Sequence, residues 1–399
     1  MHFEHLMDDT ETKPACATFD HRDDETAQKA VEIWEQLRAE GTLGRSDKHG
    51  GFLIASRYED VCEVARNAVG FSSSVTNIPA VPQFFPLINH DPPMHAKYRA
   101  IVNPLLSPAA LEPHATWTAA KAAELAGPLL ASDRFDFAMD YALPLAHAFT
   151  LHQFGFDDAP HDLMDWVNDL ILGVNGHDAA VEGGRKIGDY LRAQVAKRKD
   201  NLGQDLLSGL LEGRIDGAPL SEEHLIGYSM LLLTAGLETT ASALTSVVYY
   251  LVNHPEVCRE YVARPEIENL AMEEFVRWST PFTLISRTAT EDTTVSGCPV
   301  HAGDRVLLMW GSANRDKSAF DRADDVVLER FPNRHVGFGM GPHRCVGSHL
   351  AKMVMRAALR FVAPSLHEWR IEHPESLEWS PAEVRRLHHL PLVRVGVSS

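Results

Sequence analysis

Residues 338–347 read FGMGPHRCVG, and they lead directly into SHLAKMVMRAALRFV, residues 348–362. Glycines and a proline prevent regular structure before Cys345, whereas the residues after it predict a helix. Cys345 is therefore expected at a helix N-terminus, where the dipole and free N–H groups favour the thiolate. One thiolate at a shielded helix start, with Gly347 leaving room for a flat group, suits the axial ligand of a haem iron. The alternative is a glycine-rich loop with an inert cysteine.

This segment resembles the haem-binding segment of cytochromes P450. The shared features are Phe338 and Gly339 at its start, a histidine two residues before the cysteine (His343), and Gly347 two residues after it. The resemblance implies that Cys345 is the axial ligand of a haem b iron, and that the other four residues contact the cofactor.

A second motif lies in the helical stretch ENLAMEEFVRW, residues 268–278. Glu274 and Arg277 are three residues apart, so they share one helix face. Taken alone, such a pair usually lies on a solvated face. It resembles the ExxR motif of the P450 family, and Arg330, eight residues before Phe338, matches the arginine that joins it. This network would brace the cysteine loop through charge-assisted hydrogen bonds, which is a structural role.

A third motif is LLLTAGLETT, residues 231–240, between apolar flanks that predict a buried helix. Gly236 is costly inside a helix, and threonine can bond back to a backbone carbonyl. Departures from local rules within a buried helix are expected at functional sites, although a polar patch satisfied internally is the alternative. The segment resembles the family's oxygen-activation motif, which implies proton delivery by Glu238, a hydrogen bond from Thr239 to dioxygen and cofactor contact at Ala235. Many relatives carry aspartate where Glu238 stands.

A fourth set would bind the haem propionates. His95 and Arg99 lie one helical turn apart in HDPPMHAKYRAIV, residues 90–102, and so share a face. The segment resembles the family's propionate-binding segment, and Arg287 and His343 occupy similar positions. Taken singly, each side chain is more often an ordinary surface charge.

The substrate pocket is expected on the helix face shared with Glu238 and Thr239, in the proline-rich loop of residues 78–93, and just before Arg287. Loops of that length in compact domains are often functional. The expected pocket residues are Gln83, Phe84, Phe85, Leu87, Leu231, Thr234, Ala235, Thr283 and Leu284. Plain core packing is the alternative for the two phenylalanines. The resemblance implies a small-to-medium apolar substrate of terpenoid, fatty-acyl, aromatic or secondary-metabolite type.

Residues 331–360 contain no aspartate or glutamate. Lys352, Arg356 and Arg360 are four residues apart and form a stripe on one helix face. An ordinary solvated cationic face is the alternative to a dock for an acidic electron donor. We expect a ferredoxin or a flavodoxin, with its reductase, to deliver electrons from NAD(P)H at Arg344 and Lys352, since no flavin or iron–sulfur module is evident.

The composition argues against several other classes of protein. The chain has 399 residues, 45% of them hydrophobic, and a formal net charge of −18, which disfavours nucleic-acid binding. Five widely spaced cysteines without a CxxC pair argue against a disulfide framework or a zinc site. The acidic N-terminus and the lack of a long apolar window predict a cytoplasmic protein that does not insert into membranes. It is expected to be a monomer.

The expected fold is mainly α with small β-sheets: a single haem-containing domain of the cytochrome P450 fold over residues 1–399. Residues 1–25 are expected to be loosely ordered. Strands are expected near residues 283–287, 293–296 and 306–309. Two functional alternatives stay open: a related enzyme that uses peroxide or does not hydroxylate, and a haem-binding sensor without turnover.

Overall fold

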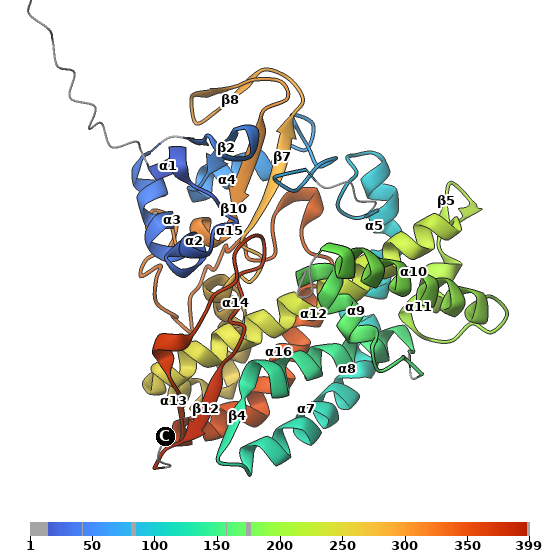
Figure 1. Cartoon of the computed structure of the whole chain (residues 1–399), viewed down its shortest axis with the longest axis vertical. Helices are drawn as coiled ribbons and strands as arrows, with labels where there is room; N and C mark the ends of the chain where they lie inside the picture. Colours follow the sequence, from blue (N-terminus) through green and yellow to red (C-terminus); the bar gives the residue numbers. More distant parts are fainter. Residues whose placement is uncertain (1–14, 42, 81–84, 157, 173–176, 397–399) are drawn as a thin grey trace, which may run out of the picture.

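The computed structural model describes residues 15–41, 43–80, 85–156, 158–172 and 177–396. A small β-rich part, built mostly from residues near the N-terminus and around 284–309, lies beside a larger helical part (Figure 1). The prediction of a mainly α fold with small β-sheets is confirmed, and the strands expected near residues 283–287, 293–296 and 306–309 are present.

The larger sheet has the strand order β1-β2-β10-β7-β3. Strand β2 (Phe52–Ala55) runs parallel to β10 (Arg305–Met309), and the other pairs are antiparallel. The outer strands are β1 (Gly44–Ser46) and β3 (Phe71–Ser72), and β7 (Leu284–Ala289) lies between β10 and β3. Alternate residues of the inner strands pack into two different hydrophobic clusters, because successive side chains of a strand point to opposite faces.

Helix α12 (Glu222–Asn253) is the long helix at the centre of the helical part. Ser221 caps it by accepting a hydrogen bond from the N–H of His224. By length and composition it could cross a membrane, but 78% of its most apolar window is buried inside the protein. It is therefore a core helix. Leu233 lies in one hydrophobic cluster and Val247 in another, so α12 joins two cores.

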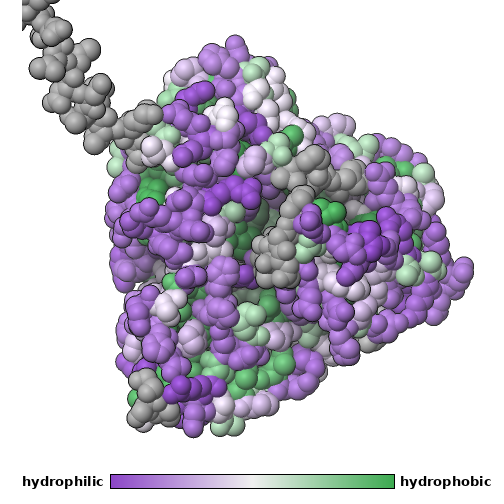
Figure 2. All heavy atoms as spheres, in the orientation of Figure 1, coloured by the Kyte–Doolittle hydropathy of each residue, from purple (hydrophilic) through white to green (hydrophobic). Residues whose placement is uncertain are grey.

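The other helices of the chain complete the helical part. The principal helices are α5 (Met94–Leu105), α7 (Ala115–Leu130), α8 (Leu143–Phe154), α9 (Leu163–Leu172), α10 (His177–Lys199), α11 (Leu206–Glu212), α13 (Pro255–Ala263), α14 (Glu268–Ser279) and α16 (Ser348–Val362). A second sheet has the order β11-β12-β4, formed by Trp369–Ile371, Pro391–Arg394 and Arg134–Asp136. Figure 2 shows a mostly hydrophilic face with hydrophobic residues gathered in patches near its middle and lower part.

The N-terminal segment is more ordered than its composition suggested. Helices α1 (Ala15–Thr18) and α2 (Asp24–Gln28) lie within residues 15–28. Phe19, with only 4% of its surface exposed, packs in the hydrophobic cluster that contains Trp34. The loose order expected for residues 1–25 therefore does not hold for residues 15–25, because apolar side chains bury them, while residues 1–14 lie outside the described residues.

Candidate active site

The cysteine loop is shaped by its glycines. Gly339 and Gly341 both have positive φ angles, 67° and 70°, which favour glycine. A Cβ at Gly341 would lie 2.4 Å from the carbonyl oxygen of Ala65, so the loop packs against α4 (Tyr58–Arg66) only because this residue lacks a side chain. The N–H of Cys345 closes the loop on the carbonyl of Phe338 at 2.7 Å.

Cys345 lies three residues before α16, at the position that the sequence predicts. Its side chain is accessible, yet the surrounding protein atoms desolvate the thiol and raise its pKa. The N–H of Gly347 and the guanidinium groups of Arg99 and Arg344 act in the opposite direction without reversing the shift. The helix start alone therefore does not hold Cys345 as a thiolate, and deprotonation would accompany binding of a metal cation, as is usual for cysteine ligands.

A group of buried basic side chains lies near this loop. The rings of His95 and His343 are 3.9 Å apart between centroids. The Nε2 atom of each is buried without a hydrogen-bond partner. Desolvation lowers the pKa of His95 to about 4 and that of His343 to about 3. Arg287 is 4% exposed, and burial lowers its pKa to about 10.

These side chains lack acidic partners. Among the described residues, no aspartate or glutamate forms an ion pair with His95, Arg99, Arg287 or His343; Arg287 donates only to the carbonyl of Ser286, and Arg99 donates to that of Arg344 at 2.9 Å. Buried cations and orphaned nitrogens are costly unless an anion meets them. The two propionates of haem would supply such anions next to a cysteine ligand. The donor set therefore fits haem, whose iron Cys345 would ligate.

Near its middle, α12 has one side that the rest of the protein covers less. Ala235 is exposed although Leu233 and Leu237 are buried. The half-buried Thr239, one turn later, donates its hydroxyl to the carbonyl of Ala235 at 2.8 Å. This is the back-bonding that the sequence predicts for a threonine within a helix.

Glu238 points into a different environment. Its carboxylate is buried, and desolvation raises its pKa to about 6, although Arg386 acts to lower it. Nη1 of Arg386 lies 3.7 Å from Oε1 of Glu238. A small cavity beside them is also lined by His147, whose Nε2 atom has no hydrogen-bond partner and whose pKa burial lowers to about 4. No motif pointed to Arg386 or His147.

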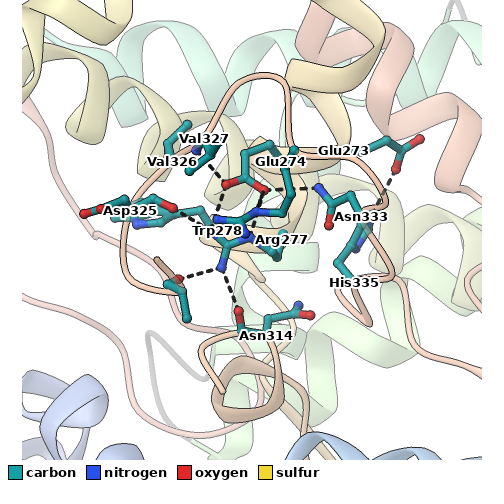
Figure 3. Close-up of polar contacts among 12 residues, drawn as sticks. Glu273, Glu274, Arg277, Trp278, Asn314, Asp325, Val326, Val327, Asn333 and His335 are labelled. Carbon is teal, nitrogen blue, oxygen red and sulfur yellow. Dashed lines mark hydrogen bonds and ion pairs between the residues drawn. The ribbon is translucent and has the colours of Figure 1, made fainter. Parts of the chain in front are cut away.

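The structure brings Glu274, Arg277 and Arg330 together, and Figure 3 shows the contact between Glu274 and Arg277. Arg277 makes a two-pronged contact with Glu274, with both distances 2.8 Å, and both side chains are fully buried. Its remaining donors bind the backbone carbonyls of Asn314, Ala323 and Asp325. Glu274 also accepts from Arg330 at 3.0 Å.

Two asparagines complete this network and were missed from the sequence. Asn333 donates to Glu274 at 3.1 Å (Figure 3). Asn314 accepts from the N–H of Val336 at 2.8 Å, so it holds the start of the cysteine loop directly. Neither residue stands in a motif. The only signals in the sequence are that Asn333 lies shortly before Phe338 and that Asn314 lies shortly after β10.

The expected pocket residues do not share one surface. Phe85 lines a cavity of about 380 Å³ together with Arg192, Glu222, Glu223, Ile226, Gly227 and Met230. Thr234 and Ala235 lie on the less covered part of α12, whereas Leu87 and Leu231 are buried in a hydrophobic cluster. Gln83 and Phe84 lie outside the described residues.

Thr283 and Leu284 were also assigned to the pocket. Thr283 is buried and bonded to the carbonyl of Glu383. Leu284 is opposite Met309 on the adjacent strand and packs with Trp34, whereas Arg287 is opposite Val306. Strand alternation therefore puts Leu284 on the face away from Arg287, which corrects its assignment to the pocket.

The basic stripe on α16 is largely neutralised. Lys352 has 14% of its side chain exposed and pairs with Glu273 of α14, which also contacts His335. Arg356 and Arg360 both pair with Glu268. Arg344 is exposed and forms no ion pair within the described part of the chain. The prediction that Lys352 is a free docking cation is therefore wrong, because α14 supplies its counter-charge.

An accessible cysteine in a glycine-rich loop, near basic side chains that could bind two carboxylates, suits a haem-thiolate protein. The profile of the family "Cytochrome P450" matches residues 161–376. Linalool 8-monooxygenase of Pseudomonas putida is 29% identical over 370 residues, which cover 87% of this chain and 91% of the relative. Mycinamicin IV hydroxylase/epoxidase of Micromonospora griseorubida is 31% identical, and the alignment covers 84% of this chain and 87% of the relative.

Solved structures agree on the fold. The cytochrome P450 PksS of the bacillaene polyketide synthase of Bacillus subtilis aligns with a TM-score of 0.87 at 24% identity, covering 94% of this chain and 99% of that one. A Bacillus megaterium P450 in complex with corticosterone aligns with a TM-score of 0.82 at 25% identity, covering 93% of this chain and 99% of that one. The chain belongs to the cytochrome P450 family and is an oxidoreductase of the monooxygenase type. The family implies haem and O₂ as its cofactor and co-substrate.

Proposed function

We propose that this P450 inserts one oxygen atom from O₂ into a small-to-medium apolar organic substrate of terpenoid, fatty-acyl, aromatic or secondary-metabolite type. The observation that carries this proposal is a group of basic side chains without an acidic partner among the described residues, beside an accessible Cys345. The group consists of His95, Arg99, Arg287 and His343. Relatives named for linalool, steroid and mycinamicin IV point to apolar substrates. The cavity at Phe85 offers the apolar side chains of Ile226 and Met230 as well as charged groups.

The overall reaction needs two electrons. One oxygen atom of O₂ enters a C–H bond of the substrate, the other leaves as water, and NAD(P)H supplies the electron pair with one further proton from solution. When bound, haem supplies activation of O₂, and a thiolate ligand favours O–O cleavage.

The protein's own groups would manage the protons. Glu238, with a pKa of about 6, can both hold and release a proton near neutral pH. Thr239 holds a hydroxyl on the less covered side of α12, one turn from Ala235. The fully buried Glu274–Arg277 pair keeps the cysteine loop in place and has no part in the chemistry.

The electron donor is proposed to be an acidic ferredoxin, with a flavodoxin as the alternative, working in the cytoplasm with a reductase. Arg344 stays in the proposed docking surface, and Arg334 and Arg66 take the place there that the sequence suggested for Lys352. Both are exposed and form no ion pair with another described residue. The backbone of Arg66 packs against the cysteine loop, since a Cβ at Gly341 would lie 3.4 Å from its Cα. Tyr58 ties the carbonyl of Arg334 to α4.

The experiment combines spectroscopy with labelled oxygen. The reduced carbon-monoxide complex of the wild type should show the red-shifted Soret band of thiolate haem, and Cys345→Ser should abolish it, while Cys258→Ser serves as a buried control. Compounds that shift the haem spectrum are then incubated with ¹⁸O₂, NADH and a surrogate ferredoxin system. Monooxygenation puts one ¹⁸O atom in the product.

The same assay separates the alternatives. A peroxide-using enzyme would form product from hydrogen peroxide at an undiminished rate without NADH. A haem-binding sensor would show ligand-dependent spectra but no ligand-dependent NADH oxidation. Either result would contradict the proposed function.

A further inference from the structure

A second cluster of chemically active side chains lies far from Cys345 in the sequence. Asp20 and His21 stand between α1 and α2, and His49 stands in the 3₁₀ turn η1 (Lys48–Gly50) before β2. One potential ligand atom from each lies within 4.8 Å of the other two. Among the residues that the structure describes, no other group of three or more histidine, cysteine or acidic side chains meets this spacing.

His21 has the hydrogen bonding of a metal ligand. Its side chain is buried, with only 3% of the residue exposed, and its Nε2 atom lies 2.8 Å from the carbonyl oxygen of Ile78. A carbonyl can only accept, so Nε2 carries the hydrogen and Nδ1 presents a lone pair. Nδ1 is buried and has no hydrogen-bond partner. Metal-bound histidines usually donate their other ring N–H to a carbonyl or carboxylate in this way.

Asp20 and His49 supply the other two donors. The Nε2 atom of His49 lies 2.9 Å from Oδ1 of Asp20, and each side chain is 23% exposed. Burial opposes ionisation of Asp20, but the hydrogen bonds from His49 and from the backbone N–H of Arg22, together with the nearby histidines, outweigh it, so the pKa of Asp20 is lowered overall. Burial also lowers the pKa of His21. Near neutral pH the cluster therefore contains a carboxylate and a neutral imidazole, the forms that bind metal cations.

We propose that Asp20, His21 and His49 form a binding site for a divalent transition metal ion such as Zn²⁺, with water as the fourth ligand. Two imidazoles and one carboxylate suit Zn²⁺ and its neighbours, whereas Mg²⁺ prefers six oxygen ligands. Tetrahedral ligands around Zn²⁺ lie roughly 3.3 Å apart, given Zn–N and Zn–O distances of about 2.0–2.1 Å. Binding therefore requires a small inward movement, which the partly exposed Asp20 and His49 side chains can make.

The metal ion would join residues 20–21 to the turn at His49, and His21 already contacts two further segments. Its Nε2 atom bonds to the carbonyl of Ile78, and its backbone carbonyl accepts from the N–H of Ala382 at 2.7 Å. Residues 382–386 include Arg386, which pairs with Glu238. A metal ion that binds only the folded chain stabilises it by mass action, so Zn²⁺ would stabilise the contact between the N-terminal segment and the rest of the protein.

The test uses the haem-loaded enzyme, freed of other metals with EDTA and desalted. Equilibrium dialysis against Zn²⁺, with bound zinc counted by atomic absorption, should give one ion per chain at the highest-affinity site. His49→Ala and Asp20→Asn should each weaken binding at that site at least about tenfold. His389→Ala is the matched control, because His389 pairs with Asp136 at 2.7 Å but belongs to no cluster of three ligands. It should bind zinc as the wild type does.

A second measurement keeps the inference independent of the enzyme's activity. Zn²⁺ should raise the midpoint temperature of the wild type and of His389→Ala, but not that of His49→Ala, and excess Mg²⁺ should neither raise it nor displace zinc. Failure of the wild type to take up zinc, or equal zinc affinity in the wild type, His49→Ala and Asp20→Asn, would overturn the proposal.

Discussion

Nη1 of Arg386 lies 3.7 Å from Oε1 of Glu238, and this ion pair links a segment near the C-terminus to the middle of α12. Both side chains are largely buried, so water screens the pair weakly. Desolvation raises the pKa of Glu238 to about 6, Arg386 acts to lower it, and Glu383 acts to raise it. Arg386 therefore helps to set the pH range in which Glu238 can exchange a proton.

Removing this cation should change the pH profile of turnover. In Arg386→Gln the carboxylate loses its nearest positive charge, so the pKa of Glu238 rises further. The limb of the kcat profile that reports this group should move to higher pH, and Glu238→Gln should abolish the limb. Arg322→Gln, which removes a guanidinium paired with the exposed Asp325, is the control. An apparent pKa that is unchanged in Arg386→Gln would exclude this role.

Glu238 should also make stability depend on pH. Its pKa is raised from the ordinary 4.5 to about 6, so between these values the folded state binds more protons than the unfolded state. The free energy of unfolding from this group therefore falls as pH rises through that window, by up to about 2 kcal/mol. Urea unfolding at pH 4.5, 5.5 and 7 should show a smaller decline in Glu238→Gln than in the wild type. Parallel curves would contradict the raised pKa.

Thr239 offers a test of proton handling on the other side of the helix. Its hydroxyl donates to the carbonyl of Ala235 at 2.8 Å and lies on the less covered side of α12. Thr239→Ala should keep the thiolate–haem spectrum but divert electrons from product to hydrogen peroxide, whereas Thr239→Ser, which keeps the hydroxyl, should recover most of the coupling. The measurement is peroxide formed per NADH consumed. Wild-type coupling in Thr239→Ala would remove this residue from the mechanism.

The Glu274–Arg277 pair should matter for stability and haem retention. Both residues are fully buried, and breaking a buried ion pair by removing one partner typically costs about 3–5 kcal/mol. Arg277→Lys keeps the charge but cannot reproduce the planar fork that binds Glu274 and three carbonyls. It should lower the free energy of unfolding and release haem faster. Arg264→Lys, at an exposed ion pair with Glu329, should have an effect of less than about 1 kcal/mol.

How far the sequence predicts the site depends on where each partner lies along the chain. The glycine loop of Cys345 and the pair Glu274–Arg277 are local patterns, and the structure reproduces their geometry. Arg386 lies 148 residues after Glu238 in the chain, and no spacing rule connects them. Leu284 was assigned to the wrong face because the phase of strand alternation depends on which cluster buries it.

The predictions for the N-terminal segment and for the basic stripe on α16 were wrong for a similar reason. The acidic composition of residues 1–25 does not reveal that Phe19 is buried in the hydrophobic cluster that contains Trp34. The absence of acids from residues 331–360 describes one stretch of chain, but α14 packs beside α16 and supplies Glu273 to Lys352. Charge patterns along one helix cannot predict such neutralisation by another.

This neutralisation changes the prediction for the electron donor. Electron transfer requires the donor's redox centre to approach the haem. Under the proposed function the side of α12 serves substrate and oxygen, so the donor is expected on the side of Cys345. On that side, Arg344, Arg334 and Arg66 are exposed, and the loop and α4 that carry them are in contact. Charges at the rim of an interface act mainly on the association rate and its salt dependence.

Arg344→Glu combined with Arg334→Glu should therefore slow reduction by an acidic ferredoxin strongly at low salt and weakly at high salt, because screening acts over about 8 Å at physiological ionic strength. Substrate affinity, read from the haem spectrum, should not change. Arg185→Glu on α10 reverses an exposed charge elsewhere and should leave the rate as it is. If the double variant is reduced at the wild-type rate in low salt, the donor docks on another face or lacks the negative charge that these arginines would attract.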